Sequence, residues 1–118
     1  MNATSYLGQL VRIQMDRPLG SCHPDHGFQY LLNYGFVPGT RAPDGEELDA
    51  YLLGVDEPVE RFTGRCIAVI HRLDDDDDKL VLAPEGMAFA DEDIRRLTHF
   101  QEQWFTSVIL REATDGGW

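Results

Sequence analysis

Two clusters of acidic residues are the part of this sequence that could do chemistry. The first, residues 44–49 (Asp-Gly-Glu-Glu-Leu-Asp), sets four carboxylates around one glycine. The second, residues 74–78, is a run of five aspartates that leads directly into Lys79. Carboxylate oxygens suit Mg²⁺, Mn²⁺ or Ca²⁺, and bound Mg²⁺ commonly completes its shell with phosphate oxygens of a substrate. We expect the two clusters to be opposite walls of one divalent-cation site that holds a phosphorylated substrate.

Such a site would suit phosphoryl transfer to water. Several carboxylates beside an anionic substrate repel it unless cations bridge them, and a bound cation also lowers the pKa of a bound water. The protein then has little to supply beyond positioning and charge neutralisation. Lys79, Arg12 and the hydroxyl of Tyr34 are the candidate phosphate partners. The alternative for each cluster is an acidic loop bathed in water, which is the commoner role of such a sequence in isolation.

Strands on either side are expected to fix the two clusters. The β-branched run Arg65–His71 predicts a strand, and residues 79–83 predict another, so that residues 74–78 form the tip of a hairpin-like connection. The apolar segment after the first cluster predicts a further strand, in which two-residue periodicity places Glu47, Asp49 and Tyr51 on one side. A turn at Gly45 would bend Asp44 back toward Asp49. Carboxylates held by fixed ends lose less entropy when they bind a cation.

The remaining elements are predicted from their hydrophobic patterns. Alternation over Leu7–Met15 indicates a first strand, and the apolar, aromatic segment Phe28–Val37 indicates a second, with Gly35 marking a bulge or a close backbone approach. One long helix begins near Ala90, with acids in its first turn. Its expected apolar stripe consists of Ile94, Leu97, Phe100, Trp104 and Val108.

Two histidines, His23 and His26, form a weaker candidate for metal binding. Pro24 and Gly27 break any helix that would align the two imidazoles. The pattern therefore favours a structured loop with histidine hydrogen bonds over a pair of metal ligands.

The whole-chain composition bounds the class of protein. With 118 residues we expect one domain spanning residues 1–118. The formal charge is −11, and nine of the 21 acids lie in the two clusters, which argues against nucleic acid as the partner. Two cysteines are too few for a disulfide framework. The sequence also has no apolar stretch long enough to cross a membrane, so we expect a soluble, cytoplasmic protein with no membrane partner.

Four segments give the chain a resemblance to a known family, the soluble family I inorganic pyrophosphatases. They are residues 33–39, residues 44–49, residues 74–84 and the helix around residues 99–102. The family signature is D-G-D-P-x-D, followed later by D and by D-x-K. The resemblance implies a mainly β (α+β) fold: an OB-like five-stranded closed barrel with one long C-terminal helix packed against it. It also implies Mg²⁺-dependent hydrolysis of pyrophosphate to two phosphates, with Mn²⁺ as an alternative cation, in a compact and divergent member that is compatible with a homo-oligomer.

The same resemblance implies roles for individual residues. The implied metal ligands are Asp44, Glu46, Asp49, Asp74 and Asp77. Glu46 and Asp49 are the implied catalytic carboxylates, since Glu46 stands where the family has the aspartate that orients the attacking water. The implied substrate-binding residues are Arg12, Tyr34, Lys79 and Arg17, the last as a substitute for a family arginine. Asp76 and Asp78 remain alternatives to Asp77 as the last metal ligand.

Departures from the family pattern keep a second hypothesis open. Glu46 is one methylene longer than the family aspartate, and Glu47 replaces a proline. Trp104 and Phe105 replace a Tyr-Lys pair that binds phosphate. The alternatives to a pyrophosphatase are therefore a non-catalytic module of the same fold that binds cation, phosphate or a protein, and a hydrolase of another phosphoanhydride.

Overall fold

The computed structural model describes residues 3–40, 45–74 and 77–112. A short 3₁₀ helix, η1 (Ala3–Tyr6), precedes the first strand. The elements that follow, in chain order, are β1 (Leu10–Arg17), β2 (Asn33–Val37), β3 (Leu48–Leu52), β4 (Arg61–Arg72), β5 (Asp78–Ala83), α1 (Asp91–Glu102) and β6 (Ser107–Leu110). In the described part of the chain, no helix has the length and apolar character needed to cross a membrane.

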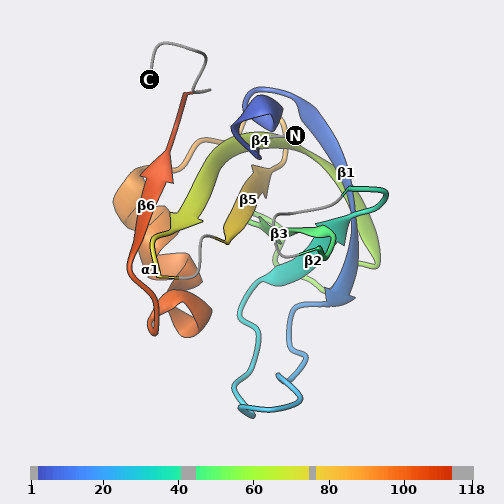
Figure 1. Cartoon of the computed structure of the whole chain (residues 1–118). Coiled ribbons are helices and arrows are strands. Elements are labelled where there is room, and N and C mark those ends of the chain that lie inside the picture. Colours follow the sequence, from blue (N-terminus) through green and yellow to red (C-terminus); the bar gives the residue numbers. More distant parts are fainter. Residues whose placement is uncertain (1–2, 41–44, 75–76, 113–118) are drawn as a thin grey trace.

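Five strands close into a barrel (Figure 1). They pair in the order β1-β2-β3-β5-β4, and β4 returns to pair antiparallel with β1. The β3–β5 pair is parallel, whereas β1–β2, β2–β3 and β4–β5 are antiparallel. The mainly β fold with a closed five-stranded barrel and a helix at its side is confirmed, and so is the hairpin-like connection between β4 and β5.

Alternation along the strands divides the apolar residues into two clusters. The barrel interior holds one cluster, which includes Val11 and Ile13 of β1 and Leu80 and Leu82 of β5. The second cluster lies on the outer face, where Tyr51, Ile70 and Val81 pack with Ile94 of α1. Because side chains alternate along a strand, Asp49 shares the outer face with Tyr51, and Lys79 shares it with Val81. The helix and the two charged residues therefore lie on the same side of the barrel.

Several predicted boundaries are wrong. Only Asn33–Val37 of the expected strand over residues 28–37 is β structure, and the preceding loop holds an isolated bridge between Cys22 and Gln29. The helix ends at Glu102, so Trp104 lies beyond it and Val108 belongs to β6, a strand that pairs with β4. Two β-branched residues in succession, Val108 and Ile109, favour that strand over a further helical turn.

Candidate active site

A cavity of about 630 Å³ opens on the outer face of the barrel, beside the C-terminal end of α1. One part of its wall is charged and another is aromatic. The lining residues are Asp16, Arg17, His23, His26, Phe28, Tyr30, Tyr34, Asp49, Arg72, Lys79, Gln101, Trp104 and Phe105. This volume is in the range of about 300–1,000 Å³ that is typical of small-molecule sites.

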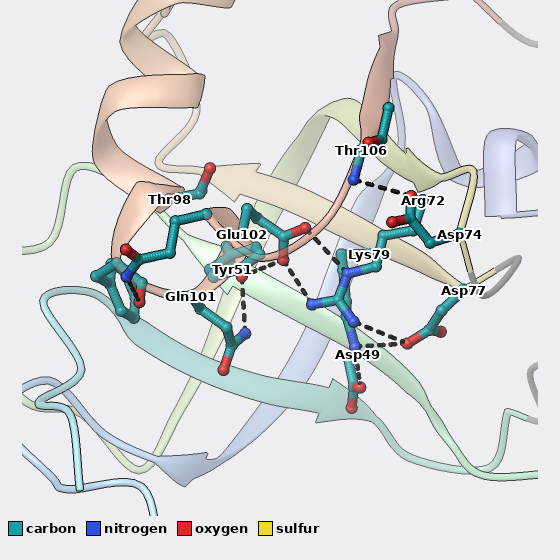
Figure 2. Close-up of polar contacts among 12 residues, drawn as sticks. Asp49, Tyr51, Arg72, Asp74, Asp77, Lys79, Thr98, Gln101, Glu102 and Thr106 are labelled. Carbon is teal, nitrogen blue, oxygen red and sulfur yellow. Dashed lines mark hydrogen bonds and ion pairs between the residues drawn. The ribbon is translucent and has the colours of Figure 1, made fainter. Parts of the chain in front are cut away.

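Lys79 lies in this cavity wall between two carboxylates, that of Asp49, which also lines the cavity, and that of Asp77 (Figure 2). Its Nζ is 2.7 Å from Oδ2 of Asp49 and 2.9 Å from Oδ2 of Asp77, and the lysine side chain is only 5% exposed. The parallel β3–β5 register places Asp49 directly opposite Lys79, while Asp77 comes just before β5. The two acidic clusters of the sequence thus meet around one cationic nitrogen.

Arg72 is the second buried cation, and it faces both acidic and aromatic groups. Its Nε and Nη2 donate to the two carboxylate oxygens of Glu102 at 3.0 and 2.7 Å. Nη1 lies 3.6 Å from Oδ2 of Asp77, and the guanidinium carbon lies 3.7 Å from the ring centre of Phe105. Burial alone would lower the pKa of Arg72, but the hydrogen bonds and charge of Glu102 outweigh it and raise that pKa. Arg72 therefore stays charged beside the cavity.

A chain of buried hydrogen bonds connects Glu102 with the barrel wall. The hydroxyl of Tyr51 donates to Glu102 at 2.6 Å, Gln101 Nε2 donates to Tyr51 at 2.7 Å, and the hydroxyl of Tyr30 donates to Gln101 Oε1 at 2.7 Å. Burial, followed by the charge of Glu102, raises the pKa of Tyr51 well above its usual value. The last turn of α1 is thereby fixed against β3 through Tyr51 (Figure 2). Through Tyr30 it is also fixed against the loop before β2.

The hydroxyl of Tyr34, which stays protonated, lies near the ion pair of Lys79 and Asp49. Burial, then the charge of Asp49 and a hydrogen bond with it, raise the pKa of Tyr34 well above its usual value. The Lys79 ammonium lies 5.6 Å from the centre of the Tyr34 ring. A neutral phenol next to a cation can donate a hydrogen bond to an anionic ligand.

A register shift in the β1–β2 pair brings Arg17 to the same site. Met15 is paired with Gly35, but the next pair joins Arg17 to Tyr34, so that one residue of β1 is left over. Gly35 permits the two backbones to approach closely, since an added Cβ would lie 2.1 Å from the carbonyl oxygen of Gln14. The close approach expected at Gly35 is confirmed.

The structure brings together five of the predicted site residues and separates three others. Asp49, Lys79, Tyr34 and Arg17 line the cavity, and Asp77 contacts Lys79. The other three, Arg12, Glu46 and Asp74, are exposed and do not line it. Asp74 accepts a hydrogen bond from the backbone N–H of Thr106 at 2.9 Å. Asp44 and Asp76 lie outside the described residues.

Sequence reasoning gave no role to Arg72, Glu102 or Gln101. The sequence did hold a signal for Arg72, which ends an apolar strand and precedes an acidic run. A charged residue in such a place is rarely buried unless it is paired with an opposite charge. Glu102 and Gln101 lay within the helix segment of the resemblance. Only the approach of the last helical turn to β4 shows that Glu102 is the partner of Arg72.

The histidine loop is held by hydrogen bonds, as the favoured interpretation expected. Nδ1 of His23 accepts the backbone N–H groups of Asp25 and His26 at 3.0 and 3.2 Å. The His23 ring also packs on Phe28, with ring centres 4.9 Å apart. His23 is thus a loop-forming residue in the cavity wall.

The donor set of the cavity suits a hard cation. Across residues 3–40, 45–74 and 77–112, no group of three His, Cys, Asp or Glu residues is arranged to hold a metal ion. Asp49 and Asp77, however, already point their oxygens at one positive charge, the ammonium of Lys79. Carboxylate oxygens are the ligands that Mg²⁺ prefers, so these two residues fit part of a magnesium shell.

Comparison with known proteins gives a consistent result. A family model described as inorganic pyrophosphatase matches residues 9–110. The chain is 35% identical over 97 residues to soluble inorganic pyrophosphatase 2 of Chlamydomonas reinhardtii, which corresponds to 71% of this chain and 50% of that protein. The chain thus spans about half the length of this curated relative.

Solved structures of inorganic pyrophosphatases share the fold. The enzyme from Ehrlichia chaffeensis aligns with a TM-score of 0.70 at 17% identity, covering 91% of this chain and 88% of the other. The enzyme from Neisseria gonorrhoeae aligns with a TM-score of 0.62 at 21% identity, covering 97% and 88%. These alignments extend over nearly the whole barrel and its helix.

Proposed function

Since this chain belongs to the inorganic pyrophosphatase family, we propose that it hydrolyses pyrophosphate to two phosphates with Mg²⁺ as cofactor. The observation that carries the proposal is the convergence of Asp49 and Asp77 on Lys79, with Asp49 and Lys79 in the wall of one cavity. Carboxylates for a hard cation and an ammonium for a phosphate oxygen are the groups that phosphoryl transfer needs.

The proposal gives individual residues roles in this reaction. Asp49 and Asp77 would hold Mg²⁺, together with Asp44, Glu46 and Asp74, the ligands implied by the sequence. The cation supplies charge neutralisation and a more acidic bound water. Lys79 and Arg17 bind phosphate oxygens, and the neutral hydroxyl of Tyr34 donates a hydrogen bond to one of them. Arg12 is proposed as a further phosphate ligand from the exposed face of β1.

The bond changes are those of an in-line displacement. The oxygen of a water molecule bonds to one phosphorus, the bond from that phosphorus to the bridging oxygen breaks, and the bridging oxygen leaves with the second phosphate. Glu46 and Asp49 are the proposed carboxylates that orient this water and accept its proton. The buried cations Lys79 and Arg72 would neutralise negative charge that accumulates on the departing phosphate.

The proposal is tested by measuring phosphate release from pyrophosphate with Mg²⁺, with EDTA, and with the Asp49→Asn variant. We expect release that EDTA abolishes and that Asp49→Asn reduces by about 10²-fold or more in kcat. Asp56→Asn, a change of an exposed loop carboxylate away from the cavity, is the matched control and should keep full activity. Absence of metal-dependent release from the unaltered protein would overturn the proposal.

A binding module of the same fold is the second candidate. The observation that favours it is the aromatic wall formed by Trp104 and Phe105, two side chains that carry no charge to bind a phosphate. Calorimetry with pyrophosphate and Mg²⁺ separates the two candidates. Tight binding of pyrophosphate that stays uncleaved for hours would identify a binder, whereas turnover identifies the hydrolase.

A further inference from the structure

A row of aromatic rings runs from the buried cations of the cavity to its mouth. The Lys79 ammonium lies 5.6 Å from the Tyr34 ring centre, and the Tyr34 and Tyr30 ring centres are 5.5 Å apart. The Tyr30 ring is 5.3 Å from that of Phe28, which is 5.6 Å from that of Trp104. Tyr34 and Tyr30 are 7% and 2% exposed, whereas Trp104 is 57% exposed. The row thus begins beside the charged groups and ends at an accessible indole.

The outer end of the row is shaped for a flat group. Trp104 and His26 lie with ring centres 6.2 Å apart and their planes inclined by 30°. Both rings line the cavity together with Phe28. An exposed tryptophan at a cavity mouth offers a π-face on which a planar ligand can stack, and the same surface gives no hydrogen bond to a phosphate.

The cavity is also larger than its charged end requires. Its volume of about 630 Å³ is within the range that holds drug-sized organic ligands. Pyrophosphate is far smaller and has no apolar surface to place against Phe28 and Trp104. The charged end, with Lys79 and Arg17, suits a diphosphate group, and the aromatic end suits an organic group attached to it.

We propose that this cavity binds and hydrolyses nucleoside diphosphates, with the diphosphate at Lys79 and Arg17 and the base stacked on Trp104. The proposal rests on the proposed phosphoanhydride hydrolysis at the same charged groups and adds a substrate class to it. Stacking on one exposed indole tolerates any base, because every base has a π-face. The site would therefore favour a diphosphate ester that carries an aromatic base, without selecting one particular nucleoside.

The reaction balances with water as the only co-reactant. The water oxygen bonds to the terminal phosphorus, and the bond between that phosphorus and the bridging oxygen breaks. The bridging oxygen stays on the nucleoside, which leaves as the monophosphate, and inorganic phosphate carries away the terminal group. One proton is released to the solvent near neutral pH.

Binding is measured with two ligands that resist cleavage and differ only in the nucleoside, α,β-methylene adenosine diphosphate and methylenediphosphonate, both with Mg²⁺. The chain has two tryptophans, so a Trp118→Phe background leaves Trp104 as the reporter of indole fluorescence. We expect the nucleoside ligand to quench this fluorescence and to bind about 5- to 150-fold more tightly than methylenediphosphonate.

Variants of Trp104 separate stacking from general packing. Trp104→Leu should remove the difference in affinity between the two ligands while leaving methylenediphosphonate binding unchanged, and Trp104→Phe should keep most of the difference. Leu31→Ala, at another exposed apolar side chain that does not line the cavity, is the matched control and should change neither affinity. Equal affinity for the two ligands, or a difference that survives Trp104→Leu, would overturn the proposal.

Activity measurements distinguish this proposal from the one on which it rests. We expect phosphate release from adenosine diphosphate with a KM that rises about 5- to 150-fold in Trp104→Leu, and a much smaller change in the KM for pyrophosphate, which has no group to stack on the indole. Cleavage of pyrophosphate without preference for the nucleoside ligand would refute only the substrate class. Stacked nucleotide that binds tightly, with neither diphosphate cleaved, would refute the hydrolase itself.

Discussion

Arg72 is the residue whose environment says most about the energetics of the site. Its guanidinium is bonded by Glu102 at two points and covered by Phe105, and both charged side chains are less than a tenth exposed. A buried ion pair adds little to folding stability compared with apolar residues of the same volume. Loss of one partner, however, leaves an uncompensated buried charge, which is strongly destabilising. The pair therefore makes the junction of α1 and β4 sensitive to single substitutions.

Removing either partner should be strongly destabilising. We expect Arg72→Met and Glu102→Leu each to lower the free energy of unfolding by about 3–5 kcal/mol, and the double variant to lose less than the sum. Chemical denaturation of the four proteins measures this coupling. Arg96→Met, which removes the exposed pair with Asp93, is the control and should cost at most about 1 kcal/mol. An equally mild effect of Arg72→Met would contradict the argument.

Cys66 gives the molecule a defined pH dependence. The thiol is 1% exposed, and burial raises its pKa from 9.0 to about 11. Because the folded state holds the proton more tightly than the unfolded state, this stabilisation is complete below pH 9 and is lost as pH rises toward 11. Between pH 9 and pH 11 we expect the free energy of unfolding to fall by about 2–3 kcal/mol more in the unaltered protein than in Cys66→Ala, as measured by denaturation at each pH. Parallel pH profiles for the two proteins would show that the thiol makes no contribution.

The bulge in the β1–β2 pair is the element that positions Arg17 in the cavity wall. Its register shift follows Met15, and Gly35 lies opposite with no room for a side chain. Asp16 and Arg17 both line the cavity just after this point. A change in the bulge should therefore affect stability and substrate binding together.

Gly35→Ala should prevent the β1–β2 backbones from meeting. An added Cβ would overlap the carbonyl oxygen of Gln14, so we expect a loss of at least about 3 kcal/mol in unfolding free energy and a raised KM for pyrophosphate. Gly64→Ala is the comparison and should cost about 1 kcal/mol, because its Cβ would meet the Ala83 carbonyl oxygen at 3.1 Å, a tight contact but far less severe than the overlap at Gly35. If the two variants unfold at the same denaturant concentration, the close approach at Gly35 is not what holds the register.

Elements with a strong local pattern could be predicted from the sequence. Alternation in β1 puts Val11, Ile13 and Met15 inside the barrel, and the pattern is visible without tertiary information. The end of α1 could not be found in this way, because Trp104 and Val108 continue the helical spacing and no glycine or proline lies between Glu102 and Gly116. Pairing of β6 with β4 decides that boundary, and this contact is non-local.

The candidate site shows the same division. Asp49 belongs to the first acidic cluster, and Lys79 directly follows the second. Their contact agrees with the sequence-based expectation that the two clusters lie at one site. The pairing of Arg72 with Glu102 depends on the angle at which α1 meets the barrel, which no local pattern encodes.

For the whole molecule, the formal charge of −11 couples stability to cations. Any salt should stabilise the fold by screening self-repulsion, whereas Mg²⁺ held by the proposed site would add a specific stabilisation. At matched ionic strength, we expect the free energy of unfolding to be about 2.7 kcal/mol higher in MgCl₂ than in NaCl when Mg²⁺ is at about a hundred times its Kd. Chemical denaturation measures this difference. Asp49→Asn should abolish the excess, and Asp56→Asn should not. Equal stabilisation by the two salts would mean that the unaltered protein holds no Mg²⁺ specifically.

The pairing of β1 with β4 also determines when the barrel can form. Leu10 is opposite Arg65 and Gln14 is opposite Arg61, so ring closure joins segments about fifty residues apart. β4 also carries β5 and β6 as neighbours, which makes one twelve-residue strand the common partner of three others. During synthesis β1, β2 and β3 emerge first, and they have no ring to close until β4 and β5 follow. Folding must therefore wait for the second half of the chain, and its rate is set by long-range strand pairing more than by formation of α1.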